Sequence, residues 1–392
     1  MRILLFTQHF YPGYKAGGVL KAVVNLVGTL NNEIEFKIVT SDRDLGDTEA
    51  YLNIIKNQWL SIGNAKVMYV KAKLKNLFEF TSILKNVPHD VLYLNGFFNF
   101  NFTVLPLIIR RLGFYKNKPI VLEPHGNFSP GAMKIKAKKK RYFIKIVKAL
   151  RLYHGIVWQA TSELEASEIR SVMGDVAKKI LVAPYLLSNP DINFGEQLPQ
   201  KKFTRQSGSL RLIFLSRISP KKNLSTLLEI LKKVEAAVTL TIYGPIEDHN
   251  YWNKCNLIIK KLPKNIKVNY NGGITSNLVP HTFVEHDLFV FPTLGENFGH
   301  VIYEALSVGT AVIVSDQTPW KQDKEGAIEV ISLEKIDDWV AIIEKWASSS
   351  DEELIDYRRI VYSYIKKYDQ ANDSAEKNRN LFKFAMEINN KF

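Results

Sequence analysis

The chain has 392 residues, 46% of them hydrophobic and 11% aromatic, which is enough for two domains with their own cores and excludes a disordered chain. Its single cysteine, Cys255, excludes a disulfide framework and any multi-thiolate metal site, and it fits a reducing compartment. The net charge of +14 predicts an acidic partner, for which nucleic acid, anionic lipid and phosphorylated substrates all qualify. The apolar run at the start is too short for a secretory signal, and no run of about 18 apolar residues occurs. We therefore expect a cytoplasmic protein, at most peripheral to a membrane.

The first part of the chain alternates between predicted strands and helices. Residues 2–7 alternate into a buried strand, and apolar residues recur at helical spacing after the loop at Gly17 and Gly18. A strand that leads through glycines into a helix is the general layout of a phosphate site, although no dinucleotide or P-loop fingerprint is present. A plain tight turn is the alternative. Further strands, which together predict a doubly wound parallel sheet, are expected at residues 36–40, 65–70, 90–95 and 120–123.

His125 follows the last of these strands, at the carboxyl edge where parallel sheets bind ligands. It stands directly before Gly126, and this position makes it a candidate site residue. A lone histidine is more often a surface or core residue, so both interpretations stay open on these residues alone.

Residues 133–153 form a basic segment, since no acidic residue occurs between Glu123 and Glu163. If the segment is one helix, its apolar stripe consists of Phe143, Ile146, Val147 and Leu150. The candidate membrane-contacting cations are Lys138, Lys139, Arg141, Lys145 and Lys148. Anionic lipid, which attracts each lysine by about 1 kcal/mol, is favoured over nucleic acid because no nucleic-acid recognition motif accompanies the lysines. A core-packed helix with a solvated basic face is the alternative.

Strands at residues 155–160 and 181–184 complete the first predicted domain, residues 1–187. The polar residues 188–209 are rich in turn formers and predict a linker. The rest of the chain is expected to form a second domain, residues 210–370, and a last helix, residues 371–392.

The second domain opens like the first. Residues 210–215 predict a strand, and further strands are expected at residues 238–243, 266–270, 288–291 and 311–315. Arg217 and Lys222 lie in the loop before the first helix of this domain. Two cations at the positive end of a helix make an anion site, and they could neutralise a departing nucleoside diphosphate without a metal ion. Two solvated loop cations are the alternative.

A later stretch places a glycine-rich loop, Gly295 to Gly299, at the start of a short helix, where free N–H groups attract an anion such as phosphate. Glu296 and Glu304, eight positions apart, therefore suit the hydroxyl groups of a polyol better than the anion itself. For Glu304, a solvated helix residue is the alternative.

Residues 295–320, GENFGHVIYEALSVGTAVIVSDQTPW, resemble almost throughout the donor-site signature of retaining glycosyltransferase family 4, also called glycosyl transferases group 1. The resemblance implies the GT-B fold, an α/β architecture of two Rossmann-like domains that face a cleft, with the last helix crossing back to the first domain. It implies a donor-binding set of Gly17, Gly18, Arg217, Lys222, Gly244, Gly273, Glu296, Asn297, Phe298, Gly299 and Glu304.

In that family, the two glutamates flank the nucleotide-sugar, so Glu296 would hold hydroxyls of the donor sugar and Glu304 the ribose. Arg217 and Lys222 would hold the diphosphate, and the base would lie near the turn at Gly273. The resemblance also places His125 beside the reacting centre, donating to the sugar or positioning the acceptor. The candidate catalytic residues are His125, Glu296, Arg217 and Lys222.

The resemblance implies retaining transfer of a hexose or N-acetylhexosamine from a nucleoside-diphosphate sugar, UDP favoured and GDP possible, with no cofactor and no metal ion. The basic segment and the missing span favour a saccharide acceptor on a polyprenyl-diphosphate lipid, as in bacterial surface polysaccharide assembly (lipopolysaccharide, O-antigen, capsule or exopolysaccharide). Expected partners are the nucleotide-sugar, this acceptor and the anionic inner face of the cytoplasmic membrane, and not nucleic acid. A catalytically silent sugar-nucleotide or polysaccharide-binding protein, and a phosphorylase or epimerase on the same fold, are the alternatives.

Overall fold

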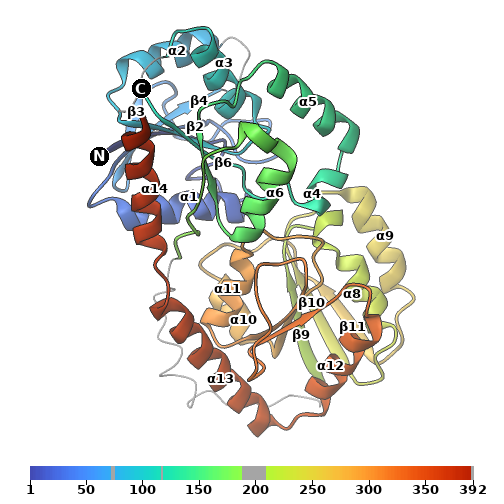
Figure 1. Ribbon diagram of the computed structural model, residues 1–392. Helices are drawn as coiled ribbons and strands as arrows, with labels where there is room; N and C mark the ends of the chain where they lie inside the picture. Colours follow the sequence, from blue (N-terminus) through green and yellow to red (C-terminus); the bar gives the residue numbers. More distant parts are fainter. Residues whose placement is uncertain (72–75, 116–117, 188–208, 390–392) are drawn as a thin grey trace. The chain divides into compact units, whose positions relative to one another are not determined.

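The computed structural model describes residues 1–71, 76–115, 118–187 and 209–389 (Figure 1). The chain divides into two compact units, which we call unit 1 (Met1–Ser188 with Asp373–Phe392) and unit 2 (Asn189–Asn372). The predicted linker, residues 188–209, lies outside the described residues except for Ser209.

Unit 1 contains a sheet in the order β3-β4-β2-β1-β5-β6-β7-β8, parallel except for the antiparallel pair β3 and β4. Its strands are β1 (Arg2–Phe6), β2 (Glu35–Ser41), β3 (Trp59–Ile62), β4 (Ala65–Val70), β5 (Val91–Asn95), β6 (Ile120–Glu123), β7 (Val157–Ala160) and β8 (Ile180–Val182). The three strands β5, β6 and β7 are buried along their whole length. In the sequence such strands are continuous apolar runs, because helices cover both faces of a parallel sheet.

The helical segments of unit 1 are α1 (Gly18–Leu30), α2 (Leu77–Asn86), η2 (Phe100–Val104), α3 (Leu105–Arg111), α4 (Pro130–Lys134), α5 (Ala137–Ala149), α6 (Glu163–Met173), η3 (Gly174–Val176) and α14 (Ser374–Asn389). One apolar core joins the sheet to α1 and α14, through residues such as Val23 and Phe382. A second core joins it to α2, α3, α5 and α6. The last helix of the chain thus packs on unit 1, where Phe382 meets the ring of Tyr93 edge to face.

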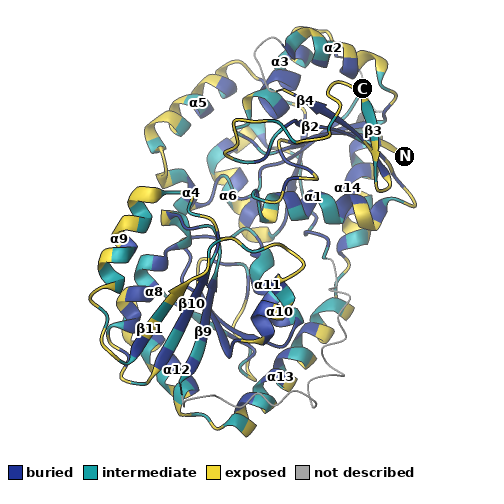
Figure 2. Ribbon diagram, turned by 180° about the vertical axis from the view of Figure 1, so that it is seen from behind, coloured by how far each residue is buried: buried dark blue, intermediate teal, exposed yellow. Residues whose placement is uncertain are grey.

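Unit 2 contains an all-parallel sheet in the order β11-β10-β9-β12-β13-β14. Its elements are β9 (Leu210–Leu215), η4 (Pro220–Lys222), α8 (Leu224–Leu231), β10 (Val238–Tyr243), α9 (His249–Ile259), β11 (Ile266–Tyr270), α10 (Val279–Val284), β12 (Leu288–Phe291), α11 (His300–Ser307), β13 (Ala311–Ser315), β14 (Ile328–Ile331), α12 (Ile336–Ser348) and α13 (Asp351–Gln370). Buried residues concentrate in the central strands of both sheets (Figure 2).

The predicted α/β fold class, with two doubly wound sheets, is confirmed. The sequence did not predict two strands, β3 and β14. Both lie at a sheet edge and are only four residues long, and part of each stays accessible to solvent. An edge strand of this kind lacks the continuous apolar run that marks a buried parallel strand.

The basic segment differs from its prediction in two ways. It is not one helix, because the chain is extended at Ile135 and left-handed at Lys136, between α4 and α5. The face of α5 that packs on unit 1 is also rotated, so that Ile144 and Val147 are buried while Ile146 is 39% exposed. Leu150, just past α5, is 54% exposed. The apolar stripe was predicted wrongly because apolar and basic residues are mixed along this segment, so that more than one face of the helix could be buried. Packing on the sheet selects one of these faces.

Candidate active site

Two loops of unit 2 meet at the carboxyl edge of its sheet, one after β9 and one after β12. Asn223, which precedes α8, adopts a left-handed conformation with φ of 60°. Its side-chain amide donates to the carbonyl of Pro292 at 2.8 Å. The Leu294 N–H donates to the carbonyl of Lys221 at 2.9 Å. These contacts fix the two loops against each other, and asparagine suits the position because it tolerates left-handed backbone.

Lys222 and Glu296 come together across these loops. The Lys222 ammonium lies 2.5 Å from the Glu296 carboxylate, and the two side chains are only 13% and 11% exposed. The Thr293 hydroxyl donates to the same carboxylate oxygen at 3.2 Å. Burial acts to raise the pKa of Glu296, but the charges of Lys222 and Lys221 outweigh it and lower the pKa below its usual range. Glu296 is therefore an ionised acceptor held beside a cation.

Arg217 contacts a different carboxylate, that of Glu247, at 3.0 Å. Both side chains are partly exposed, and Glu247 follows the turn at Gly244. Gly244 has φ of 138°, and a Cβ there would lie 1.9 Å from the Ser216 carbonyl oxygen, so only glycine fits. The Gly244 N–H donates to the carbonyl of Gly272 at 2.7 Å, which links this turn to the one that holds Gly273.

The third part of the unit 2 site is the start of α11. Gly299 precedes this helix with φ of 78°, and no side chain caps its N-terminus. The Trp320 indole donates to the Phe298 carbonyl at 2.6 Å and thereby holds the loop. Asn297 is partly buried in the same loop, and Glu304 is partly buried in the second turn of α11. An uncapped helix start leaves N–H groups that can bind an anion.

Sequence reasoning missed several residues that hold these loops. Thr293 and Glu247 contact the predicted Glu296 and Arg217, and Asn223 and Trp320 fix the backbone beside them. A detectable signal existed for Asn223, since asparagine between a loop and a helix indicates a left-handed residue. Thr293 lies three residues before Glu296 in the same loop, whereas Glu247 and Trp320 act through contacts between segments more than 20 residues apart, which no local pattern reveals.

Two further predicted loops lie in unit 1. Gly17, with φ of 62°, precedes α1, which has no capping side chain and no acidic residue in its first turn. His125 and Gly126 are both left-handed, with φ of 53° and 64°. The His125 Nδ1 atom lies 2.6 Å from the Tyr185 hydroxyl and 3.1 Å from Glu123 Oε1. Gly18 is the first residue of α1 and is exposed.

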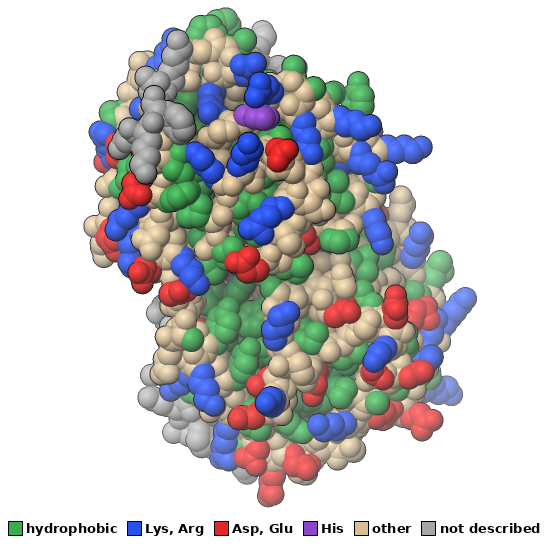
Figure 3. Space-filling model, in the orientation of Figure 1, with side chains coloured by type: hydrophobic (Ala, Val, Ile, Leu, Met, Phe, Trp, Pro, Cys, Tyr) green, Lys and Arg blue, Asp and Glu red, His purple; other side chains and the backbone are tan. Residues whose placement is uncertain are grey.

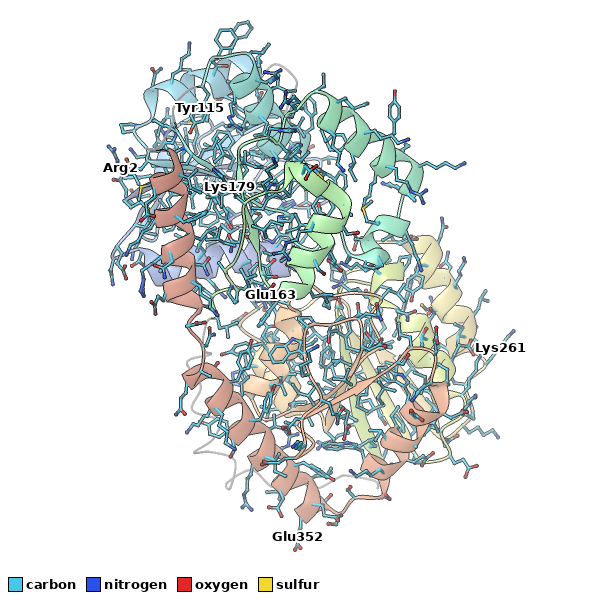
Figure 4. The ribbon with its side chains drawn as sticks, in the orientation of Figure 1. Arg2, Tyr115, Glu163, Lys179, Lys261 and Glu352 are labelled. Atoms are coloured by element: carbon cyan, nitrogen blue, oxygen red, sulfur yellow. The ribbon has the colours of Figure 1, made fainter. Side chains whose placement is uncertain are left out.

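A second buried carboxylate, Glu165, fixes the His125 loop. It lies in the first turn of α6, the helix that begins at Glu163 (Figure 4). One of its oxygens accepts from the Gly126 N–H at 2.7 Å, and the other accepts from the N–H and hydroxyl of Thr161 at 2.8 Å. Burial nevertheless raises the pKa of Glu165. The sequence showed it only as a glutamate near a helix start.

Four of the five predicted membrane-contacting cations are exposed on α5: Lys138, Lys139, Arg141 and Lys145. Lys148 is the exception, because its ammonium donates to the Val172 carbonyl at the end of α6, at 2.6 Å. Tyr142, Ile146 and Leu150 are exposed among these cations, and basic side chains gather over α5 (Figure 3). We call this surface the α5 face.

Two further findings concern the described part of the chain. No helix there is long and apolar enough to span a membrane. Within the same residues, no three or more histidine, cysteine, aspartate and glutamate side chains are grouped so that they could hold a metal ion.

Residues 197–360, which lie in unit 2, match the family model described as "Glycosyl transferases group 1". No curated protein sequence matches the chain. Several solved structures are similar over nearly its whole length. The Anabaena protein HepE in complex with UDP and glucose has a TM-score of 0.68 at 15% identity, with 98% of this chain and 99% of that chain covered.

Two sugar-phosphate synthases are similar as well. The trehalose-6-phosphate synthase OtsA has a TM-score of 0.71 at 11% identity and covers 98% of this chain and 99% of its own. The sucrose-phosphate synthase of Thermosynechococcus elongatus has a TM-score of 0.65 at 16% identity and covers 94% and 97%. The chain thus has the GT-B fold, and residues 197–360 of unit 2 match the glycosyl transferases group 1 model.

Proposed function

We propose that the protein is a retaining glycosyltransferase that moves a hexose or N-acetylhexosamine from a nucleoside-diphosphate sugar to a saccharide acceptor. The observation that carries this proposal is the buried pair of Lys222 and Glu296 at the carboxyl edge of the unit 2 sheet. An ionised acceptor next to a cation suits a ligand that presents hydroxyl groups beside a phosphate. A UDP donor is favoured because the similar HepE was crystallised with UDP-glucose.

The donor would be held by charges and backbone groups of unit 2. Lys222 and Arg217 neutralise the diphosphate, and the N–H groups around Asn297 and Gly299 at the start of α11 add to them. Glu296 accepts from hydroxyls of the sugar, and Glu304 from the ribose. Because Lys222 and Arg217 contact Glu296 and Glu247 in the structure, a bound diphosphate would compete with these carboxylates for the two cations.

In the reaction, the bond from the anomeric carbon to the diphosphate oxygen breaks, and an acceptor hydroxyl forms the new bond on the same face. The proton of that hydroxyl passes to the departing diphosphate. Lys222 and Arg217 stabilise the negative charge that develops there, which is the largest catalytic contribution we assign to the protein. His125, Gly17 and Gly18 are the residues that we assign to unit 1, with His125 beside the reacting sugar.

The test is a panel of UDP- and GDP-sugars. A true donor at about 100 times its dissociation constant should stabilise the protein by about 2.7 kcal/mol, visible as a rise in melting temperature. The same donor should be hydrolysed slowly without an acceptor, releasing its nucleoside diphosphate. Binding without any hydrolysis would instead support a catalytically silent binding protein, and sugar-phosphate formation with inorganic phosphate would support a phosphorylase.

For the acceptor, we propose a saccharide carried on a polyprenyl-diphosphate lipid, with the α5 face against the anionic inner surface of the cytoplasmic membrane. The exposed Tyr142, Ile146 and Leu150 can enter the headgroup region while Lys138 and Lys145 contact lipid phosphates. Flotation with phosphatidylglycerol vesicles and with phosphatidylcholine vesicles tests this. Equal binding to both, or to neither, removes the support for the lipid-linked acceptor.

A further inference from the structure

A chain of buried polar side chains leads through unit 1 to His125. It starts on α14, where Asn378 accepts from the Gln159 side-chain amide at 3.2 Å. Tyr93 lies next, with its hydroxyl 2.9 Å from Gln159 Oε1 and 2.5 Å from Glu123 Oε2. Glu123 then approaches the His125 ring, whose Nδ1 lies 3.1 Å from Oε1 without forming a hydrogen bond to it. Three strands, the loop after β6 and the last helix of the chain are thus joined by polar contacts.

The two ring nitrogens of His125 have different surroundings. Nδ1 faces both the Tyr185 hydroxyl and Glu123. Nε2 is buried and has no hydrogen-bond partner among the described residues, and the whole side chain is only 3% exposed. A buried nitrogen without a partner costs about 1–3 kcal/mol, and a left-handed histidine adds backbone strain. Both costs occur at one residue of a candidate site, which is typical of a group reserved for a ligand.

We infer that Glu123 is a positioning residue that keeps a proton on His125 Nδ1, so that Nε2 is free to accept a hydrogen bond from a substrate hydroxyl. This inference rests on the proposed function of His125. A carboxylate oxygen 3.1 Å from Nδ1 attracts an N–H group and repels a nitrogen lone pair, so it favours a proton on this nitrogen even though the two atoms do not form a hydrogen bond. The Tyr185 hydroxyl can donate or accept and therefore does not decide the tautomer. The carboxylate decides it.

The surroundings of Glu123 suit this task. Glu123 lies at the carboxyl end of β6 and is only 2% exposed. Burial first, and the charge of Glu123 second, raise the pKa of Tyr93 far above its usual range. Tyr93 therefore keeps its proton and donates it to Oε2, which leaves Oε1 for the imidazole. A buried charge that lost these partners would be costly, so the arrangement is specific.

A small cavity beside this chain of contacts has a volume of about 10 Å³. Among its lining residues are Tyr93, Glu123, Gln159, Tyr185 and Asn378. This volume is close to the space that one water molecule needs. The contacts therefore have room for a bridging water but not for a substrate.

The direct test is nitrogen NMR of the imidazole rings in the full-length protein, with the His125 signals assigned by their loss in His125→Gln. The expected wild-type state is protonated at Nδ1 and unprotonated at Nε2. In Glu123→Gln, a substantial fraction of the His125 rings should instead carry the proton on Nε2. Glu165→Gln is the matched control, because it alters a buried carboxylate of α6 that binds the same loop at Gly126. The His125 tautomer should stay as in wild type in this variant. A wild-type proton on Nε2, or no change in Glu123→Gln, would overturn the inference.

A kinetic test adds a readout that loss of folding cannot imitate. With UDP-glucose as donor and water as acceptor, Glu123→Gln should lower kcat by about 10- to 100-fold, part of what a positioned acid-base group contributes, and leave the donor KM nearly unchanged. In a His125→Gln background the same change should have almost no further effect, because both act through one ring. An undiminished effect in that background contradicts the inference. If wild type releases no UDP, the proposed function fails, whereas the NMR result still decides the tautomer.

Discussion

The two units have similar, mainly parallel sheets, but one is strongly basic and the other is nearly neutral. Unit 1 contains 31 lysines and arginines against 16 aspartates and glutamates, whereas unit 2 contains 22 against 23. The net charge of +14 therefore belongs to unit 1, although the two cations proposed to bind the diphosphate lie in unit 2. The net charge of a unit therefore reflects an extended basic surface such as the α5 face. It does not locate the site of one small anionic ligand, which depends on two well-placed cations.

The units also hold their candidate residues differently. In unit 2, neighbouring loops interlock through backbone contacts and place an ion pair between them. In unit 1, His125 contacts Tyr185 and Glu123, and further side chains from β5, β7 and α14 are linked to Glu123 in turn. The following predictions test these differences.

The largest effect is expected from Lys222→Ala. It removes a cation that stabilises the leaving diphosphate and leaves Glu296 buried without its partner. Release of UDP from UDP-glucose should fall by about 10²- to 10³-fold. The control is Lys232→Ala, which changes a partly exposed lysine directly after α8 that pairs with Glu229, and it should retain activity. A Lys222→Ala enzyme with nearly normal kcat would remove the central premise of the donor site.

Charge reversal on the α5 face should have the next largest effect. The triple change of Lys138, Lys139 and Lys145 to Glu should weaken binding to phosphatidylglycerol vesicles by at least about 10²-fold, at roughly 1 kcal/mol per lysine. Reversal of three exposed lysines of unit 2, Lys254, Lys261 and Lys264, is the matched control. Equal losses in both variants would show that net charge rather than the α5 face drives binding.

A glycine substitution compares the backbone requirements of the two units. Gly244→Ala places a Cβ 1.9 Å from a carbonyl oxygen in unit 2 and should lower the free energy of unfolding by about 1–3 kcal/mol or more. Gly28→Ala, inside α1 of unit 1 with no atom within 4 Å of the new Cβ, should instead stabilise by about 0.5–1 kcal/mol. Urea unfolding measures both. A harmless Gly244→Ala would mean that the turn can open without cost.

The smallest effects concern pH, where Glu296 and Glu165 should act with opposite signs. The pKa of Glu296 is lowered in the folded protein, so its contribution to stability is present above its ordinary value of 4.5 and is lost as the pH falls through the folded value. The pKa of Glu165 is raised, so stability is gained as the pH falls from the folded value toward 4.5. Urea unfolding at a series of pH values measures how the free energy of unfolding depends on pH. The contribution of Glu296 to this pH dependence should disappear in Glu296→Gln, and that of Glu165 in Glu165→Gln. Slopes of equal sign would refute the opposed environments.

Much of unit 2 could be predicted because its information is local. The strands β9 to β13, the loop from Gly295 to Gly299 and the cations Arg217 and Lys222 all follow from short patterns in the sequence. The edge strands β3 and β14 escaped prediction because a half-exposed strand has no distinctive apolar run. For α5, the pattern was compatible with more than one buried face, and only packing on the sheet selected Ile144 and Val147.

The sequence by itself determined the α/β architecture, the strand-loop-helix units and the residue types of the donor loops, because hydrophobic period, glycine placement and charge are properties of neighbouring residues. Tertiary structure alone decided that Lys222 pairs with Glu296, that Arg217 pairs with Glu247 and that Glu123 faces His125. The first two pairs join different loops, and sheet order determines which loops meet at one edge. The third pair depends on the left-handed backbone at His125, two residues after Glu123. A local pattern can predict a side chain's chemistry, but its ionisation and orientation depend on what the fold places beside it.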